Sequence, residues 1–168
     1  MLVPAVALAL AAMPAAATSA RSSAAVSTAA VPQGFVGMMI DGPLYPDTDP
    51  AVDLGAQLDS MVASGVQSLR LTFDWGYAQP YASWSKVPAA MRSDFVDVGG
   101  VPTRFGLFDE IVGLAAQRGL PVLPVILNAP KWDGVRYRLS LVDIPRKDAP
   151  YAAFAAALVR RYGPHGSF

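Results

Sequence analysis

The sequence predicts a parallel α/β fold, in which strands and helices alternate along the chain. From residue 34 onward, short apolar runs alternate with stretches whose apolar residues recur at helical spacing. A weak internal repeat supports this pattern, because residues 63–71 and 117–125 each contain a helix end, a glycine and an apolar strand. Repeated strand–helix units of this kind are typical of a barrel or of a doubly wound sheet.

The first two expected strands flank a helix. Residues 34–40, GFVGMMI, form a short apolar run suited to a buried strand. After a loop rich in proline and aspartate comes a helix that Gly65 ends. The apolar face of this helix is expected to carry Leu54, Leu58, Met61 and Val62. Residues 66–73, VQSLRLTF, are the second expected strand.

A long loop leads to a second helix, expected over residues 105–118 and ended by Gly119. Its apolar face is expected to carry Phe108, Ile111, Val112 and Ala115. Residues 120–127, LPVLPVIL, are nearly all apolar, as a parallel strand covered on both faces should be, although Pro124 removes one ladder hydrogen bond. The third helix shows the clearest spacing of apolar residues, with one buried stripe. That stripe consists of Tyr151, Phe154, Ala155, Leu158, Val159 and Tyr162.

The composition narrows the possible partners and chemistry. Thirteen basic and thirteen acidic residues cancel without any block of like charge, so we expect no nucleic-acid partner and no attraction to an anionic membrane surface. The chain has no cysteine and one histidine, which excludes a disulfide framework, a thiolate nucleophile and a histidine-rich metal site. We therefore expect no metal and no cofactor, and a neutral partner.

The N-terminus has the pattern of an exported protein. Residues 1–20 form an apolar alanine- and leucine-rich run that ends in small residues, as in a secretory signal peptide, although no basic residue precedes Arg21. A membrane anchor is the alternative, but Pro4 and Pro14 interrupt the run and it is short for a span. Residues 21–33 are rich in alanine and serine and predict a flexible leader. We expect a secreted protein, away from the membrane once the signal is cleaved.

The second expected strand has one polar face. Its odd-numbered positions are Leu69, Leu71 and Phe73, and its even-numbered positions are Ser68, Arg70, Thr72 and Asp74. In a closed barrel the inward face lines the active site near the carboxyl ends of the strands, so Arg70 and Asp74 are expected to point at a substrate or a catalytic group. The alternative is a structural arginine paired with a carboxylate.

Aromatic residues gather in the expected strand-to-helix loops. They are Tyr45, Trp75, Tyr77, Tyr81, Trp84 and Trp132. Flat aromatic faces beside aspartate and asparagine suit the apolar face of a neutral sugar ring. The alternative is that they pin the long loop after residue 74. Trp132 is the stronger site candidate, because its loop starts directly from a strand end.

Four segments in succession carry a resemblance to a known family. They are GFVGMMIDG, VQSLRLTFDWGYAQP, FGLFDEIVGLAAQRGLPVLPVILNAPKW and PYAAFAAALVRRYGPHGSF. Residues 34–168 resemble the opening of secreted (β/α)8 retaining glycoside hydrolases of the endoglucanase and β-xylosidase-like kind, in the cellulase superfamily. The resemblance implies a partial TIM barrel of about three of eight strand–helix units, cut before the fourth strand. It also implies hydrolysis of a neutral oligo- or polysaccharide with β linkages.

The resemblance assigns supporting roles to residues of this chain. Arg70 would orient the catalytic nucleophile, and the substrate subsites would be lined by Asp74, Trp75, Asn128 and Trp132. The family's catalytic glutamates come from later strands, beyond residue 168.

The carboxylates of this chain do not suggest a catalytic pair of their own. Its single glutamate, Glu110, falls within the second expected helix, and Asp41, Asp74 and Asp133 fall in the loops of three different units. We therefore expect the 168-residue chain to be inactive by itself. The alternative is a secreted, non-catalytic carbohydrate-binding or interaction module.

Overall fold

The structure is a computed structural model, and it describes residues 30–40, 42, 49, 51–136 and 142–168. The predicted signal peptide and residues 21–29 of the predicted leader lie outside the described residues, as do Asp41 and Tyr45. The elements below belong to one compact unit, Val31–Phe168.

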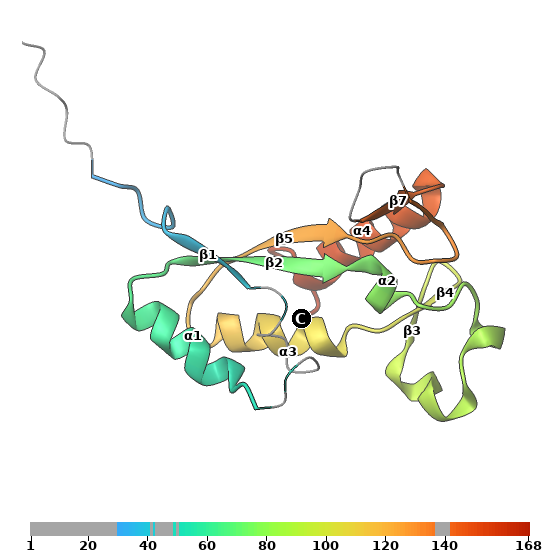
Figure 1. Cartoon of the computed structure of the whole chain (residues 1–168), viewed down its shortest axis with the longest axis horizontal. Coiled ribbons are helices and arrows are strands. Elements are labelled where there is room, and N and C mark those ends of the chain that lie inside the picture. The colour runs from blue at the N-terminus through green and yellow to red at the C-terminus, as the bar shows by residue number, and fades with distance from the viewer. Residues whose placement is uncertain (1–29, 41, 43–48, 50, 137–141) are drawn as a thin grey trace, which may run out of the picture. The chain divides into compact units, whose positions relative to one another are not determined.

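The central feature is a parallel three-stranded sheet with the order β1-β2-β5 (Figure 1). Its strands are β1 (Gly37–Ile40), β2 (Ser68–Asp74) and β5 (Val122–Leu127). In this register Met39 lies opposite Arg70, and Phe73 lies opposite Ile126. The predicted mixed α/β class and the three predicted parallel strands are confirmed. The expectation that the first of them is a buried strand is wrong, since Ile40 is the one buried residue of β1. The described strands form an open sheet with β1 and β5 at its edges, and they do not close into a barrel.

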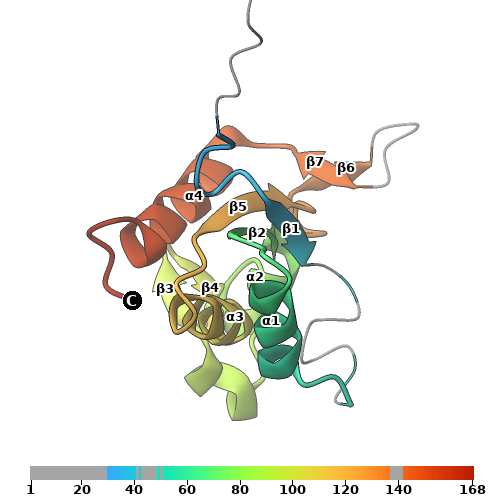
Figure 2. The same cartoon turned by 90° about the vertical axis from the view of Figure 1, so that its left-hand side faces the viewer.

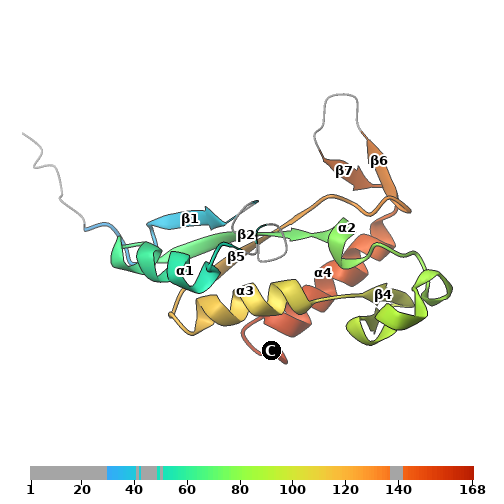
Figure 3. The same ribbon diagram turned by 60° about the horizontal axis from the view of Figure 1, so that its bottom comes forward.

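Three helices lie on one side of this sheet (Figure 3). They are α1 (Leu54–Ala63), α3 (Gly106–Ala116) and α4 (Asp148–Tyr162). Helix α1 begins where the Asp53 carboxylate accepts a hydrogen bond from the Ala56 amide at 3.0 Å. Gly65 and Gly119, which end α1 and α3 in the two repeated segments, both have positive φ, a conformation that glycine adopts without steric cost.

The core lies between the sheet and these helices. Leu69, Leu71 and Phe73, the apolar face of β2, are at most 1% exposed. They belong to one cluster with Leu58 of α1, Phe108 and Ile111 of α3, and Phe154 and Leu158 of α4. Figure 2 views the sheet end-on, with α1 and α3 beside each other beneath β1 and β2. The predicted alternation of β2 is therefore confirmed on its apolar face.

Other expected core positions are exposed. Val62 is 42% exposed and Val159 is 69% exposed, because α1 and α4 each turn a narrower stripe toward the sheet than the sequence predicts. Helix α4 buries Ala157 in place of Val159. The expectation that residues 120–127 are covered on both faces is wrong, since the described helices pack on one face and Leu123 on the other is 62% exposed.

The long loop after β2 contains structure that the sequence did not predict. It forms α2 (Trp75–Ala78), the 3₁₀ helices η2 (Trp84–Lys86) and η3 (Ala89–Asp94), and an antiparallel hairpin of β3 (Val96–Val98) and β4 (Val101–Thr103). A second antiparallel hairpin, β6 (Gly134–Arg136) and β7 (Asp143–Pro145), lies between β5 and α4.

Ion pairs connect successive helices on the covered side of the sheet. Arg118, just after α3, makes a bidentate contact with Asp59 of α1, at 2.7 and 3.1 Å. Arg161 of α4 makes a bidentate contact with Asp109 of α3, at 2.7 and 2.5 Å. The Tyr162 hydroxyl also donates to Asp109 at 2.7 Å. Burial raises the pKa of Tyr162, and this hydrogen bond adds to the shift, so the hydroxyl stays a donor.

These two ion pairs differ in exposure, so they are expected to contribute differently to the free energy of unfolding. The Asp109 side chain is 24% exposed and the Asp59 side chain 67%. Asp109→Ala leaves Arg161 and Tyr162 without their acceptor and is expected to lower the free energy of unfolding by about 2 kcal/mol. The matched Asp59→Ala change is expected to cost clearly less than Asp109→Ala, because Asp59 is exposed and water replaces it as a partner of Arg118. Urea denaturation followed by circular dichroism measures both, and equal losses would contradict this ranking.

Candidate functional site

The candidate site lies where β2 and β5 end. Asp74 is the last residue of β2, and Asn128 directly follows β5. The Asn128 side-chain amide donates a hydrogen bond to Asp74 Oδ2 at 2.7 Å, and the Gly76 amide donates to the Asn128 carbonyl at 2.7 Å. Parallel strands end at the same edge of a sheet, so two predicted site residues that are 54 positions apart meet there.

Asp74 also shapes the chain that leaves β2. Its Oδ1 accepts a hydrogen bond from the Tyr77 amide at 2.7 Å and so caps the short helix α2. Both carboxylate oxygens therefore have N–H donors, which fixes the orientation of the group. Asn128 has a φ of 55°, a left-handed conformation that asparagine tolerates better than most residues.

Trp132 stands on the loop that leaves β5. Its indole Nε1 donates to the backbone carbonyl of Gln79 at 2.8 Å, and its ring meets Trp75 edge-on, with centroids 6.1 Å apart and planes at 80°. The side chain is half-buried, so part of the ring remains exposed. Trp132 and Asn128 thus both bind the segment from Asp74 to Gln79, and this defines the candidate site as a pair of cross-linked loops.

Trp75 does not line a substrate subsite, contrary to the sequence-based prediction, because it is buried in the core. It is 1% exposed, and its ring stacks on Phe154 with centroids 6.0 Å apart and planes at 17°. Tyr151 and Trp132 approach the same ring edge-on. Because the ring is covered on all these sides, Trp75 supports the candidate site from the core and offers no exposed face to a sugar.

Arg70 lies apart from the other predicted site residues. It is four residues before Asp74 on the open face of the sheet, which corresponds to about 13 Å along a strand. Its guanidinium contacts the sulfur of Met39, and it lines a shallow pocket of about 330 Å³ with Met39, Phe35 and Leu123. The described structure therefore does not bring Arg70 to the strand ends.

Several residues of the site were missed by sequence reasoning. Gln79 is 1% exposed and Thr103 is fully buried, and the Gln79 side-chain amide donates to the Thr103 hydroxyl at 2.8 Å. The Arg104 guanidinium lies 3.7 Å above the Tyr77 ring, and its Nε donates to the Tyr77 carbonyl at 2.9 Å. The aromatic loop sequence pointed to this region, but no spacing indicated contacts between residues more than 20 positions apart.

Trp84 belongs to the β3–β4 region and not to the cross-linked loops. Its indole donates to Asp97 Oδ2 at 2.8 Å, and the Gly100 amide donates to Oδ1 of the same carboxylate at 3.0 Å. The Gly100 amide, followed by the Trp84 indole, lowers the pKa of Asp97. Trp84 thus orders the loop that leads into the hairpin, as the alternative interpretation of the aromatic residues predicts.

The acidic residues near the strand ends act as hydrogen-bond acceptors. Asp133 is 2% exposed and accepts from the Lys147 amide at 3.3 Å. Glu110 lies within α3, on the helix-covered side of the sheet.

No group of three acidic or histidine side chains suited to a metal ion occurs among the described residues. None of the described helices has the length and apolar character to cross a bilayer.

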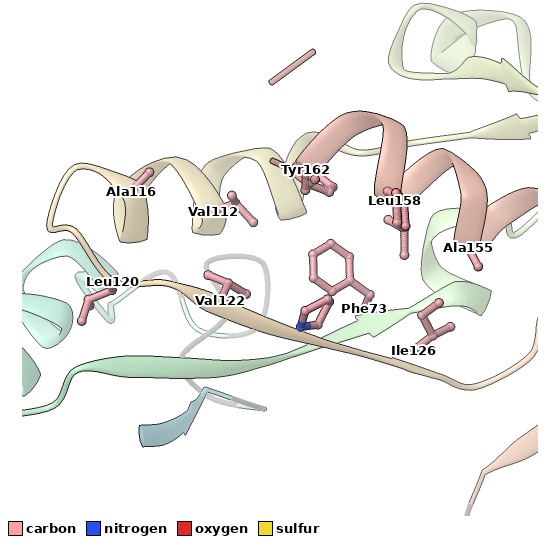
Figure 4. Close-up of a pocket in the computed structure, with 12 residues that line it drawn as sticks. Phe73, Val112, Ala116, Leu120, Val122, Ile126, Ala155, Leu158 and Tyr162 are labelled. Atoms are coloured by element: carbon pink, nitrogen blue, oxygen red, sulfur yellow. The ribbon is translucent and has the colours of Figure 1, made fainter. Parts of the chain in front are cut away.

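A second pocket, of about 410 Å³, lies between α3, α4 and β5 (Figure 4). Phe73, Val112, Val122 and Leu158 point into it, and Ile126 lies at one end. The Tyr162 hydroxyl on its rim is already bonded to Asp109. With a lining of apolar side chains, this pocket has no convergent polar groups to orient a sugar, so the strand ends are the better candidate site.

Comparison with known protein families and with curated proteins found no match to this chain. A half-buried indole beside a fixed carboxylate and amide suits a neutral, hydroxyl-bearing ligand.

The left-handed conformation of Asn128 can be tested by substitution. Asn128→Gly and Asn128→Ala both remove the hydrogen bond to Asp74, but only alanine also has a steric penalty at a φ of 55°. The glycine variant is therefore expected to be more stable than the alanine variant by about 1 kcal/mol, measured by urea denaturation. An alanine variant as stable as the glycine variant would mean that the left-handed turn is not maintained in solution.

Proposed function

We propose that this chain is the N-terminal part of a secreted (β/α)8 domain of the glycoside hydrolase type, which acts on a neutral β-glycan. The parallel order of β1, β2 and β5 supports this proposal, as does the placement of α1, α3 and α4 on one face. A barrel has helices on the outside alone, whereas a doubly wound sheet has them on both faces.

The proposed glycan binding rests on one observation. Hydrogen bonds connect the loop after β2 with the loop after β5. Three of them hold Asn128 and Trp132 against the segment Asp74–Gln79, at 2.7, 2.7 and 2.8 Å. In parallel α/β domains, ligands bind at the carboxyl ends of the strands. The Trp132 ring would stack on the apolar face of a sugar, and the polar rim would bind its hydroxyls.

In this proposal the described residues contribute binding and not the reaction itself. Retaining hydrolysis requires two carboxyl groups about 5–5.5 Å apart, one as acid/base and one as nucleophile. Asp74 uses both its oxygens as acceptors, and Asp133 is buried against a backbone amide. The catalytic glutamates would then come from sequence beyond residue 168, with Arg70 on the inward face of the completed barrel.

The same observation favours a second candidate, a secreted carbohydrate-binding module without catalysis. Carboxylates held by amides can orient sugar hydroxyls without transferring a proton. The two candidates differ in one measurement, which is the hydrolysis of aryl β-glucosides and β-xylosides by a longer protein that contains the following strands. Turnover supports the hydrolase, and binding without turnover supports the module.

Glycan binding is expected to depend on Trp132. Trp132→Ala removes the half-buried ring and is expected to weaken binding to soluble β-glucan or xylan at least about tenfold, which corresponds to about 1.4 kcal/mol. Trp84→Ala is the matched control, because Trp84 bonds Asp97 outside the cross-linked loops, and it is expected to leave binding within about twofold. Isothermal titration calorimetry measures both. Equal affinities for wild type and Trp132→Ala would contradict the proposed site.

A further inference from the structure

Gln79 connects Trp75, Thr103 and Trp132, the first two through its buried side chain and the third through its backbone carbonyl. It is 1% exposed, and its Oε1 accepts a hydrogen bond from Trp75 Nε1 at 2.6 Å. An indole N–H can only donate, so this contact fixes which end of the amide faces Trp75. The other end, Nε2, donates to the Thr103 hydroxyl at 2.8 Å, and that hydroxyl donates onward to the Val101 carbonyl at 3.1 Å.

The backbone of Gln79 is held as tightly as its side chain. The Gln79 backbone amide donates to the Trp75 carbonyl at 2.8 Å. Pro80 follows Gln79 and restricts the backbone conformation of Gln79. The remaining polar group, the Gln79 carbonyl, accepts from Trp132 Nε1 at 2.8 Å. The half-buried indole of Trp132 is thereby oriented by a residue that three other hydrogen bonds hold in place.

Residues at the end of the β3–β4 hairpin hold Gln79 and the residue before it. Thr103, at the end of β4, receives the Gln79 amide, and the next residue, Arg104, donates its backbone amide to the Ala78 carbonyl at 2.9 Å. Thr103 and the residue after it, Arg104, thus bind Gln79 and the last residue of α2, Ala78. Each hydrogen-bonding atom in this buried chain has a partner, which is the condition under which such networks specify one geometry.

From these contacts we infer that Gln79 is a positioning residue for glycan recognition, which fixes the orientation of the Trp132 indole through its contacts with Trp75 and with Thr103 at the end of β4. This inference rests on the proposed function. Gln79 does not touch the ligand itself. It acts through the ring of Trp132, whose stacking on a sugar requires a fixed plane.

The first variant is Gln79→Met, which keeps the length of the side chain, removes its two side-chain hydrogen bonds and leaves the backbone carbonyl that accepts from Trp132. The readout is the exciton couplet in the far-ultraviolet circular dichroism that two neighbouring indoles produce, here Trp75 and Trp132. A Trp84→Phe background removes the third tryptophan. Gln79→Met is expected to lose most of the couplet and to bind soluble β-glucan or xylan at least tenfold more weakly, while the helical signal remains.

The second variant, Gln79→Glu, tests the hydrogen-bond pattern directly. The protonated carboxylic acid accepts from Trp75 and donates to Thr103, as the amide does, whereas the carboxylate cannot donate. Burial raises the pKa of such a group, so couplet and affinity are expected to be near wild type at acid pH and to fall as the pH rises. The wild-type couplet is expected to stay constant over the same range.

The outcomes separate the inference from the proposed function. A folded Gln79→Met protein with an unchanged couplet overturns the inference, even if the wild type binds glycan. A lost couplet with unchanged affinity also overturns it, because the orientation of Trp132 would then not matter for recognition. If both variants lose the helical signal at every pH, Gln79 is a folding residue and the inference is wrong. If wild type binds no β-glycan, the proposed function fails, and the couplet still shows whether Gln79 orients Trp132.

Discussion

The structure depends on the burial of one face of a single strand. Leu69, Leu71 and Phe73 of β2 are almost fully covered, and helices from three parts of the chain pack on them. Each such side chain contributes about 1.5–3 kcal/mol when it leaves water. Because β2 is the middle strand, this face fixes α1, α3 and α4 on the same side of the sheet, and Arg70 lies on the side that none of these described helices covers. The carboxyl end of β2 is then the fixed point from which the candidate site is built.

Polar contacts add specificity to this apolar framework. The ion pair Asp59–Arg118 connects α1 with the end of α3, and the ion pair Asp109–Arg161 connects α3 with α4. At the strand ends, Asp74 and Gln79 bind the loop after β5 through Asn128 and Trp132. A loop held in this way costs little further ordering when a ligand binds, which favours recognition by a rigid aromatic ring.

The sequence predicted those features that repeat over short distances. Periodicity located β2, α3 and α4, because a buried face recurs every second residue in a strand and every third or fourth in a helix. It could not locate the β3–β4 hairpin, since strands of three residues are too short to show alternation. It also could not separate Trp75 from Trp132. Both are loop tryptophans after a strand, and only the position of α4, with Phe154 against Trp75, buries one and leaves the other half-exposed. The pairing of Gln79 with Thr103, 24 residues apart, left no local signal at all.

In the proposed function, the cross-linked loops after β2 and β5 bind a neutral glycan through Trp132. Titration of the ¹⁵N-labelled protein with a soluble β-glucan or xylan oligosaccharide, followed by NMR of the three indole N–H signals, tests it most directly. The Trp132 signal is expected to shift most. The Trp75 signal is expected to respond weakly, because its ring meets the Trp132 ring edge-on, and the Trp84 signal is expected not to move. A shift confined to Trp84, or three signals that do not move at saturating oligosaccharide, would contradict the claim.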